Sequence, residues 1–127
     1  MKLPQELRYT KEHEWVAFDA KTGVGTVGIT YYAQGELGDI VFVELPAKGA
    51  RIEAHKAFGT IEAVKAVSEL FAPVTGEVVA VNGELESNPQ LVNSEPYAGG
   101  WMIKVRLEKP DEIASLLSAA EYEKHVS

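Results

Sequence analysis

Short runs of alternating apolar and polar residues, many of them rich in Val and Ile, recur along the chain. Such runs predict β-strands, because successive side chains of a strand point to opposite faces of a sheet. The predicted strands are Glu14–Phe18, Gly25–Ile29, Ile40–Leu45, Ala57–Val64, Val67–Ala72, Glu77–Val81 and Trp101–Leu107. Turn-forming clusters such as DAKTG, PVTG and PYAGG separate them. The short spacing favours an antiparallel sandwich or barrel over βαβ units.

The C-terminal segment is the only one whose pattern predicts a helix of several turns. Residues 110–112, Pro-Asp-Glu, suit a first turn, and apolar residues then follow at helical spacing. Lys124 and His125 stand where the dipole of a helix C-terminus favours cations. We therefore expect a helix over about 111–125 that packs its apolar stripe on a sheet.

Two shorter helical turns are predicted from capping residues. Thr30 is expected to cap a turn over Tyr31–Gln34 that Gly35 and Gly38 bring to an end. Asn88 followed by proline predicts a cap and a first turn for the PQLV segment. The chain is thus expected to be mainly β, with few and short helices.

Composition narrows the class of protein. The 127 residues, 46% of them hydrophobic, suit a single domain, 1–127, with a modest core. A net charge of −7 and the lack of a basic run argue against nucleic-acid binding. The absence of cysteine excludes disulfides and thiol chemistry of the chain's own. No stretch resembles a signal peptide, transit peptide or membrane span, so we expect a cytoplasmic, prokaryotic protein without membrane contact.

The stretch FGTIEAVKAVSELFAPV, 58–74, alternates like a β-hairpin with Lys65 next to its midpoint. A lysine at such a tip is most often an ordinary solvated residue. A second interpretation is a covalent attachment point, since Ala63 and Ala66 are small and leave the amine approachable. A Schiff-base lysine requires burial that a hairpin tip does not offer. The pattern alone leaves the first two interpretations open.

Other candidate chemistry is weaker. GVGTVG, 23–28, has the G-x-G-x-x-G spacing of dinucleotide-binding loops, but its Val and Ile neighbours favour a strand over the long helix that such a site needs. An NAD-binding enzyme is therefore a minor alternative, which NAD titration would test. The three histidines share no metal-ligand spacing, so no metal site is expected. EHEW, 12–15, is the one acidic cluster beside an aromatic residue.

Seven segments together resemble the glycine cleavage system H-protein family in order and spacing over nearly the whole chain. They are YTKEHEWV (9–16), VGIT (27–30), LGDIVFVELP (37–46), FGTIEAVKA (58–66), PVTGEVVAVN (73–82), NPQLVN (88–93) and PYAGGWMIKV (96–105). The resemblance implies a barrel-sandwich hybrid fold of two small antiparallel sheets. It places Lys65 on the family's lipoylated lysine.

The family's role, as the resemblance implies it, is that of a non-catalytic shuttle with covalent lipoate. The lipoyl group takes an aminomethyl group from a pyridoxal-phosphate glycine decarboxylase and delivers it to a folate-dependent aminomethyltransferase. Dihydrolipoamide dehydrogenase then reoxidises the dithiol, and a lipoate ligase or lipoyl transferase attaches the cofactor. An H-like protein that donates or relays lipoate to other lipoyl enzymes is the alternative.

A carboxylate-lined cleft would shield the cationic aminomethyl group from water. The hypothesis assigns Glu12, His13, Glu14 and Glu69 to that cleft, because EHEW matches the family and Glu69 follows the modified hairpin. His55 departs from the family near a turn that often has glycine, so the local geometry there is expected to be less favourable.

Overall fold

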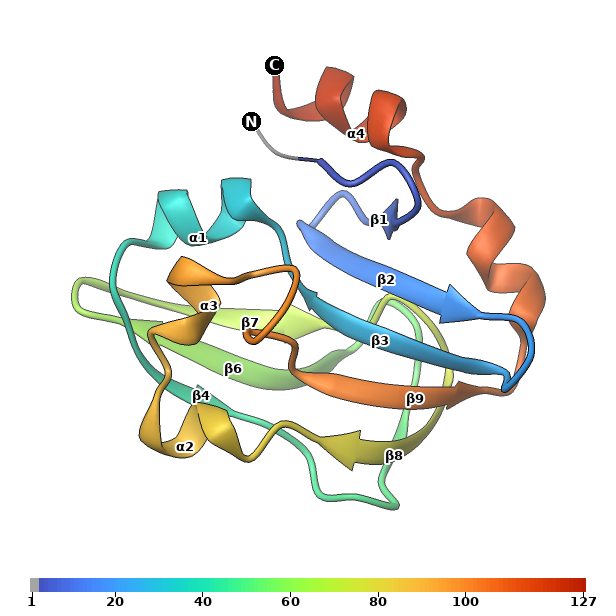
Figure 1. Cartoon of the computed structure of the whole chain (residues 1–127), viewed down its shortest axis with the longest axis horizontal. Coiled ribbons are helices and arrows are strands. Elements are labelled where there is room, and N and C mark those ends of the chain that lie inside the picture. The colour runs from blue at the N-terminus through green and yellow to red at the C-terminus, as the bar shows by residue number, and fades with distance from the viewer. Residues whose placement is uncertain (1–2) are drawn as a thin grey trace.

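Two antiparallel β-sheets make up most of the protein, whose computed structural model describes residues 3–127 (Figure 1). The larger sheet has six strands in the order β1-β2-β3-β9-β8-β5, and the smaller has three in the order β4-β6-β7. The strands are β1 (Arg8–Tyr9), β2 (Glu14–Asp19), β3 (Val24–Ile29), β4 (Ile40–Glu44), β5 (Arg51–Ile52), β6 (Ala57–Ala63), β7 (Ala66–Phe71), β8 (Gly76–Val81) and β9 (Ile103–Leu107). The sheets form no closed barrel. All seven predicted strands are confirmed with ends that shift by at most two residues, whereas the two-residue strands β1 and β5 were not predicted.

The main core lies between the two sheets. Along β2, Val16 faces this core and Trp15 faces the opposite side, as strand alternation requires. Trp15 packs there with Tyr9 and Tyr122 in a second cluster under the C-terminal helix α4 (Ala119–Val126). The six-stranded sheet therefore has a buried layer on each face (Figure 1).

The prediction of a single C-terminal helix over about 111–125 is wrong, because the helix is interrupted in the middle of this segment. The segment forms a 3₁₀ helix, η1 (Pro110–Ser115), then an extended link, then α4. In the link, Leu117 exchanges two backbone hydrogen bonds with Tyr9. Ser118 then starts α4 with a capping box, in which its hydroxyl accepts from the Glu121 amide and the Glu121 carboxylate accepts from the Ser118 amide. The serine cap explains the break that apolar spacing alone does not reveal.

The shorter helices also differ in detail from the prediction. Thr30 caps α1 as expected, but α1 (Tyr31–Leu37) continues through Gly35 and ends at Gly38, which has φ of 87°. Asn88 is not an N-cap: it ends α2 (Glu84–Ser87), and Gln90 precedes α3 (Leu91–Ser94).

The G-x-G-x-x-G segment forms a turn and a strand rather than a phosphate-binding loop. Gly23, with φ of 76°, closes the turn before β3. Gly28 lies in β3 opposite Trp15, whose indole ring comes within 2.7 Å of the position that a Cβ atom would take. The glycine is needed there for close packing.

Candidate functional site

Lys65 lies at the tip of the hairpin that β6 and β7 form. Ala63 pairs with Ala66, so Val64 and Lys65 are the whole connection. The predicted strand ends instead leave Lys65 and Ala66 between the strands, so Lys65 lies in the turn as expected but the turn begins one residue earlier. Neither residue has a positive φ, so the turn is not of the primed types that Asn-Gly favours. The Val64 amide donates instead to the Asp39 carbonyl at 3.1 Å, which ties the tip to the chain just before β4. The tip is thus held by the protein and does not depend on turn-forming residues.

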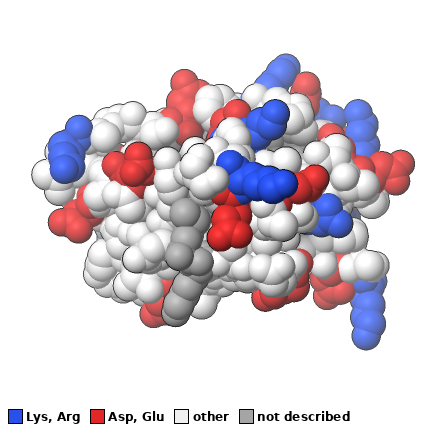
Figure 2. All heavy atoms as spheres, turned by 90° about the horizontal axis from the view of Figure 1, so that it is seen from above, with Lys and Arg blue, Asp and Glu red and all other residues white. Residues whose placement is uncertain are grey.

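The surroundings of Lys65 combine an exposed amine with exposed apolar side chains. Lys65 is exposed, and Val64 and Val67 are 73% and 68% exposed. The Cε atom of Lys65 lies 3.6 Å from the Cβ position of Gly38, at the end of α1. Figure 2 shows Lys or Arg atoms at the end of the molecule where the hairpin lies in Figure 1, with acidic groups beside them.

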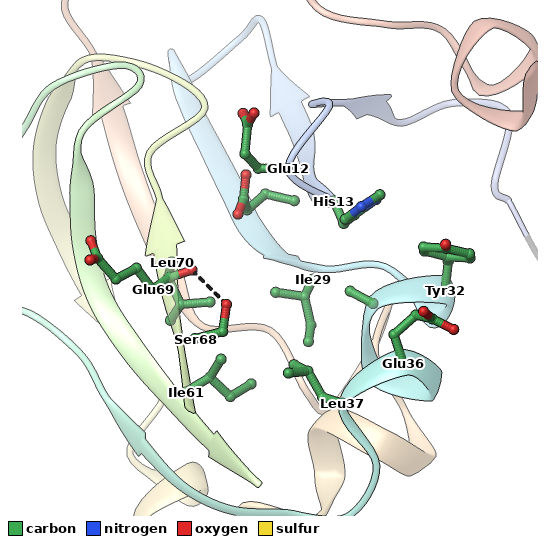
Figure 3. Close-up of a pocket in the computed structure, with 12 residues that line it drawn as sticks. Glu12, His13, Ile29, Tyr32, Glu36, Leu37, Ile61, Ser68, Glu69 and Leu70 are labelled. Carbon is green, nitrogen blue, oxygen red and sulfur yellow. Dashed lines mark hydrogen bonds between the residues drawn. The ribbon is translucent and has the colours of Figure 1, made fainter. Parts of the chain in front are cut away.

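A pocket of about 220 Å³ opens between the turn before β2, helix α1 and the hairpin (Figure 3). Helix α1 contributes Tyr32 with Glu36 and Ala33 with Leu37. The residues of each pair are one helical turn apart and therefore lie on the same face of the helix. The twelve residues that line the pocket are Glu12, His13, Glu14, Ile29, Tyr32, Ala33, Glu36, Leu37, Ile61, Ser68, Glu69 and Leu70. All four residues that the sequence assigned to a cleft are therefore brought together at one pocket.

Glu14 is the most buried charged residue of this pocket, with 2% of its surface exposed. Its Oε1 atom accepts from the Thr10 hydroxyl at 2.6 Å, and its Oε2 atom accepts from the Phe71 amide at 3.3 Å. Glu14 on β2 therefore connects the six-stranded sheet to β7 of the smaller sheet. Burial raises the pKa of Glu14 to about 8, against the effect of these two hydrogen bonds. The group is thus largely a neutral acid at pH 7.

His13 has a left-handed backbone conformation, with φ of 77°, that few residues other than glycine adopt. Its carbonyl accepts from the Thr30 amide at 3.0 Å. Burial lowers the pKa of His13, His125 lowers it further, and Glu12 and Glu36 act in the opposite direction. The imidazole ring lies against the ring of Tyr32, with centroids 4.9 Å apart. Both rings border the pocket, as Figure 3 shows.

Ser68 and Glu69 face different sides of β7. Ser68 pairs with the buried Ile61, and Figure 3 shows its hydroxyl directed toward the pocket. Glu69 pairs with Thr60, and its carboxylate points away from Glu12 and His13. The sequence therefore identifies Glu69 as a neighbour of the pocket but misses Ser68, which alternation along β7 would have indicated.

The other pocket residues have no chemical signature in the sequence. Tyr32 and Glu36 become neighbours of His13 only because α1, which starts at the end of β3, lies beside the turn before β2. Within residues 3–127, no three His, Asp or Glu side chains lie close enough together to hold a metal ion. The same part of the chain contains no helix long and apolar enough to cross a membrane.

Comparison with known proteins identifies the family to which the chain belongs. A sequence model described as glycine cleavage H-protein matches residues 7–127. The glycine cleavage system H protein of Bacillus cereus strain B4264 is 57% identical over 122 residues, which cover 96% of this chain and 94% of the relative. The corresponding protein of Bacillus cytotoxicus is 56% identical over the same shares.

A solved structure agrees with these relatives. A crystal structure of a glycine cleavage system H protein from Mycobacterium marinum matches with a TM-score of 0.90 at 35% identity and covers 98% of each chain. The chain therefore belongs to the glycine cleavage H-protein family. The resemblance seen in the seven sequence segments is confirmed.

Proposed function

We propose that this protein is the lipoyl-bearing shuttle of a glycine cleavage system. Lipoate attached to Lys65 supplies a dithiol that carries an aminomethyl group from glycine decarboxylase to the aminomethyltransferase and is reoxidised by dihydrolipoamide dehydrogenase. The protein's own residues then hold and shield the cargo without making or breaking its bonds. On this proposal the protein is a carrier and not an enzyme.

The observation that carries the proposal is the position of Lys65 relative to the pocket. Ser68 faces the pocket and stands three residues after Lys65, which is about 10 Å of extended chain at the rise of a β-strand. Lys65 also lies beside Gly38, directly after the pocket residue Leu37. A flexible group on Lys65 thus has a hollow close to its attachment point.

The lining of the pocket suits such a cargo. Its apolar members, among them Ile29, Ile61 and Leu70, offer contact to hydrocarbon and sulfur. Glu14 and Glu12 offer carboxyl groups to an ammonium group. A cation that docks beside Glu14 favours loss of the proton that burial retains there, because an opposite charge lowers a carboxyl pKa. Capture of a cationic cargo is then coupled to release of a proton.

The alternative role, relay of lipoate to other enzymes, uses the same lysine but has no need for a carboxyl-lined pocket. Relayed lipoate is uncharged at its ring end, whereas an aminomethyl cargo is cationic at neutral pH. The buried Glu14 therefore supports the shuttle over the relay.

Intact mass and peptide mapping after incubation with lipoate, ATP and a lipoate ligase test the attachment. We expect one lipoyl increment on Lys65, none in Lys65→Arg, and an unchanged increment in the control Lys124→Arg, because Lys124 is an exposed lysine of α4. Absence of modification, or modification elsewhere, would refute the proposal.

Loading with the aminomethyl group then separates shuttle from relay. Lipoylated protein that accepts the group from glycine decarboxylase should release it to water faster in Glu14→Gln than in the wild type. The control Glu123→Gln, at an exposed glutamate of α4, should match the wild type. Lipoylated protein that cannot be loaded would support the relay.

A further inference from the structure

The Tyr122 hydroxyl group joins the C-terminal helix to two walls of the pocket. It lies 2.7 Å from Nδ1 of His13 and 2.8 Å from Oγ1 of Thr30. The Thr30 hydroxyl in turn accepts from the Ala33 amide at 3.1 Å and so caps α1. Tyr122 is fully buried, with no exposed surface. A single phenol group thus contacts both the turn that presents His13 and the start of the helix that faces it.

The direction of these hydrogen bonds follows from their partners. Thr30 Oγ1 uses a lone pair for the Ala33 amide, and its hydrogen is free to point at Tyr122. We assign Tyr122 as the acceptor from Thr30 and the donor to Nδ1 of a neutral His13. The charged and titratable groups around His13, besides Tyr122, are Glu12 and Glu14 of its own segment, Tyr32 and Glu36 of α1, and His125 of α4. Because burial lowers the pKa of His13, the neutral ring is the form that the site favours.

His13 is held in its unfavourable backbone conformation by contacts on three sides. Its amide donates to the Thr10 carbonyl at 3.2 Å, its carbonyl accepts from Thr30, and its ring nitrogen meets Tyr122. Glu14 follows directly, and its amide donates to the Thr10 hydroxyl at 3.0 Å. A change in the orientation of His13 therefore shifts the residue that presents the buried carboxyl group.

We propose that Tyr122 is a positioning residue for the pocket: its hydroxyl group fixes His13 against the start of α1 and thereby holds the pocket in the shape that retains the cargo. Helix α4, which does not line the pocket, then contributes to the lifetime of the loaded state. This inference rests on the proposed shuttle function, because retention of an aminomethyl group is the property that it explains.

Tyr9 offers a matched control for a variant at Tyr122. The two rings stack with centroids 5.0 Å apart, and both are fully buried in the same cluster. The Tyr9 hydroxyl, however, donates to the Pro4 carbonyl at 2.7 Å, outside the pocket. Tyr122→Phe and Tyr9→Phe each remove one buried hydroxyl group, and only the first touches His13.

The first experiment measures how long lipoylated protein retains the aminomethyl group in water. We expect Tyr122→Phe to shorten the half-life about fivefold, the factor that one lost hydrogen bond produces, and Tyr9→Phe to leave it at the wild-type value. Equal half-lives in the two variants would overturn the inference. Wild-type protein that cannot be lipoylated or loaded would instead refute the proposed function.

The second experiment does not depend on the cofactor. Nitrogen-15 NMR of His13 in unmodified protein should show an unprotonated Nδ1 at neutral pH. The His13 titration midpoint should move to higher pH in Tyr122→Phe, because the neutral ring loses its donor, and should stay in place in Tyr9→Phe. Identical His13 titrations in both variants would overturn the inference. If Tyr122→Phe does not fold, a wild-type Nδ1 shift that shows no hydrogen bond, neither accepted nor donated, is enough to overturn it.

Discussion

Replacement of the buried Glu14 by glutamine should remove the pH dependence of stability that this group contributes between pH 5 and 8. The pKa of Glu14 is about 8 in the folded protein and about 4.5 without burial. In that window the folded protein retains a proton that the unfolded chain has released. The neutral acid therefore contributes its full share of the unfolding free energy below the unfolded-state pKa. This contribution is lost as pH rises toward the folded-state pKa, at about 1.4 kcal/mol per pH unit.

The magnitude follows by integration across the window. Between pH 5 and pH 8 the wild type should lose roughly 3 kcal/mol of unfolding free energy through this one group. Glutamine has nearly the same shape, cannot ionise, and offers an oxygen to the Phe71 amide and an NH₂ group to the Thr10 hydroxyl. Glu14→Gln should therefore be about as stable as the wild type at pH 5 and clearly more stable at pH 8.

Urea unfolding at five pH values from 5 to 9 measures this difference directly, since other titrating groups are common to both proteins and cancel. Glu123→Gln, at an exposed position of α4, controls for removal of a charge from an acidic protein. Parallel stability curves for wild type and Glu14→Gln would show that Glu14 is ionised throughout, and the proton coupling proposed for cargo capture would fail with it.

Four further substitutions, one of them a matched control, test packing and backbone conformation by thermal or urea unfolding. Gly28→Ala should cost about 1–3 kcal/mol because its new methyl group meets the Trp15 ring, whereas Gly83→Ala, with nothing within 4 Å, should cost little; equal effects would contradict the packing argument. Gly35→Ala, inside α1 with open space around it, should stabilise by about 0.5–1 kcal/mol, and a loss would contradict this. His55→Gly should stabilise by up to about 1 kcal/mol because φ is 73° there, and a loss would show another role for His55.

The strands and the hairpin tip could be predicted from the sequence because they depend on local alternation. The pattern on both sides of Lys65 predicts a hairpin with this residue in its turn, although the observed pairing of Ala63 with Ala66 starts the turn one residue earlier than the predicted strand ends. Register then fixes which side chains face inward. The break in the C-terminal helix could not be predicted from apolar spacing. It depends on the long-range pairing of Leu117 with Tyr9 and on a serine cap that competes with helix continuation.

The pocket was predicted only in part, for a similar reason. Glu12, His13 and Glu14 are adjacent in the sequence and were found together. Tyr122 is 109 residues from His13, and no local pattern indicates that its hydroxyl group reaches that ring. The buried carboxyl group also looks ordinary in the sequence, since the pKa of Glu14 is raised by what folds over it.

Backbone strain by itself does not locate the site. His13 and His55 both have a left-handed conformation, with φ of 77° and 73°. The His55 ring makes no hydrogen bond within residues 3–127, whereas His13 is tied to Tyr122 and is followed directly by a buried, largely neutral glutamate. A strained backbone at one residue and a buried carboxyl group at the next persist only where the surrounding fold stabilises them. Strained and buried titratable residues are typical of functional sites. The energetic cost at residues 13 and 14 therefore supports the turn at residues 12–14 as the part of the proposed site that is specialised to hold a cargo.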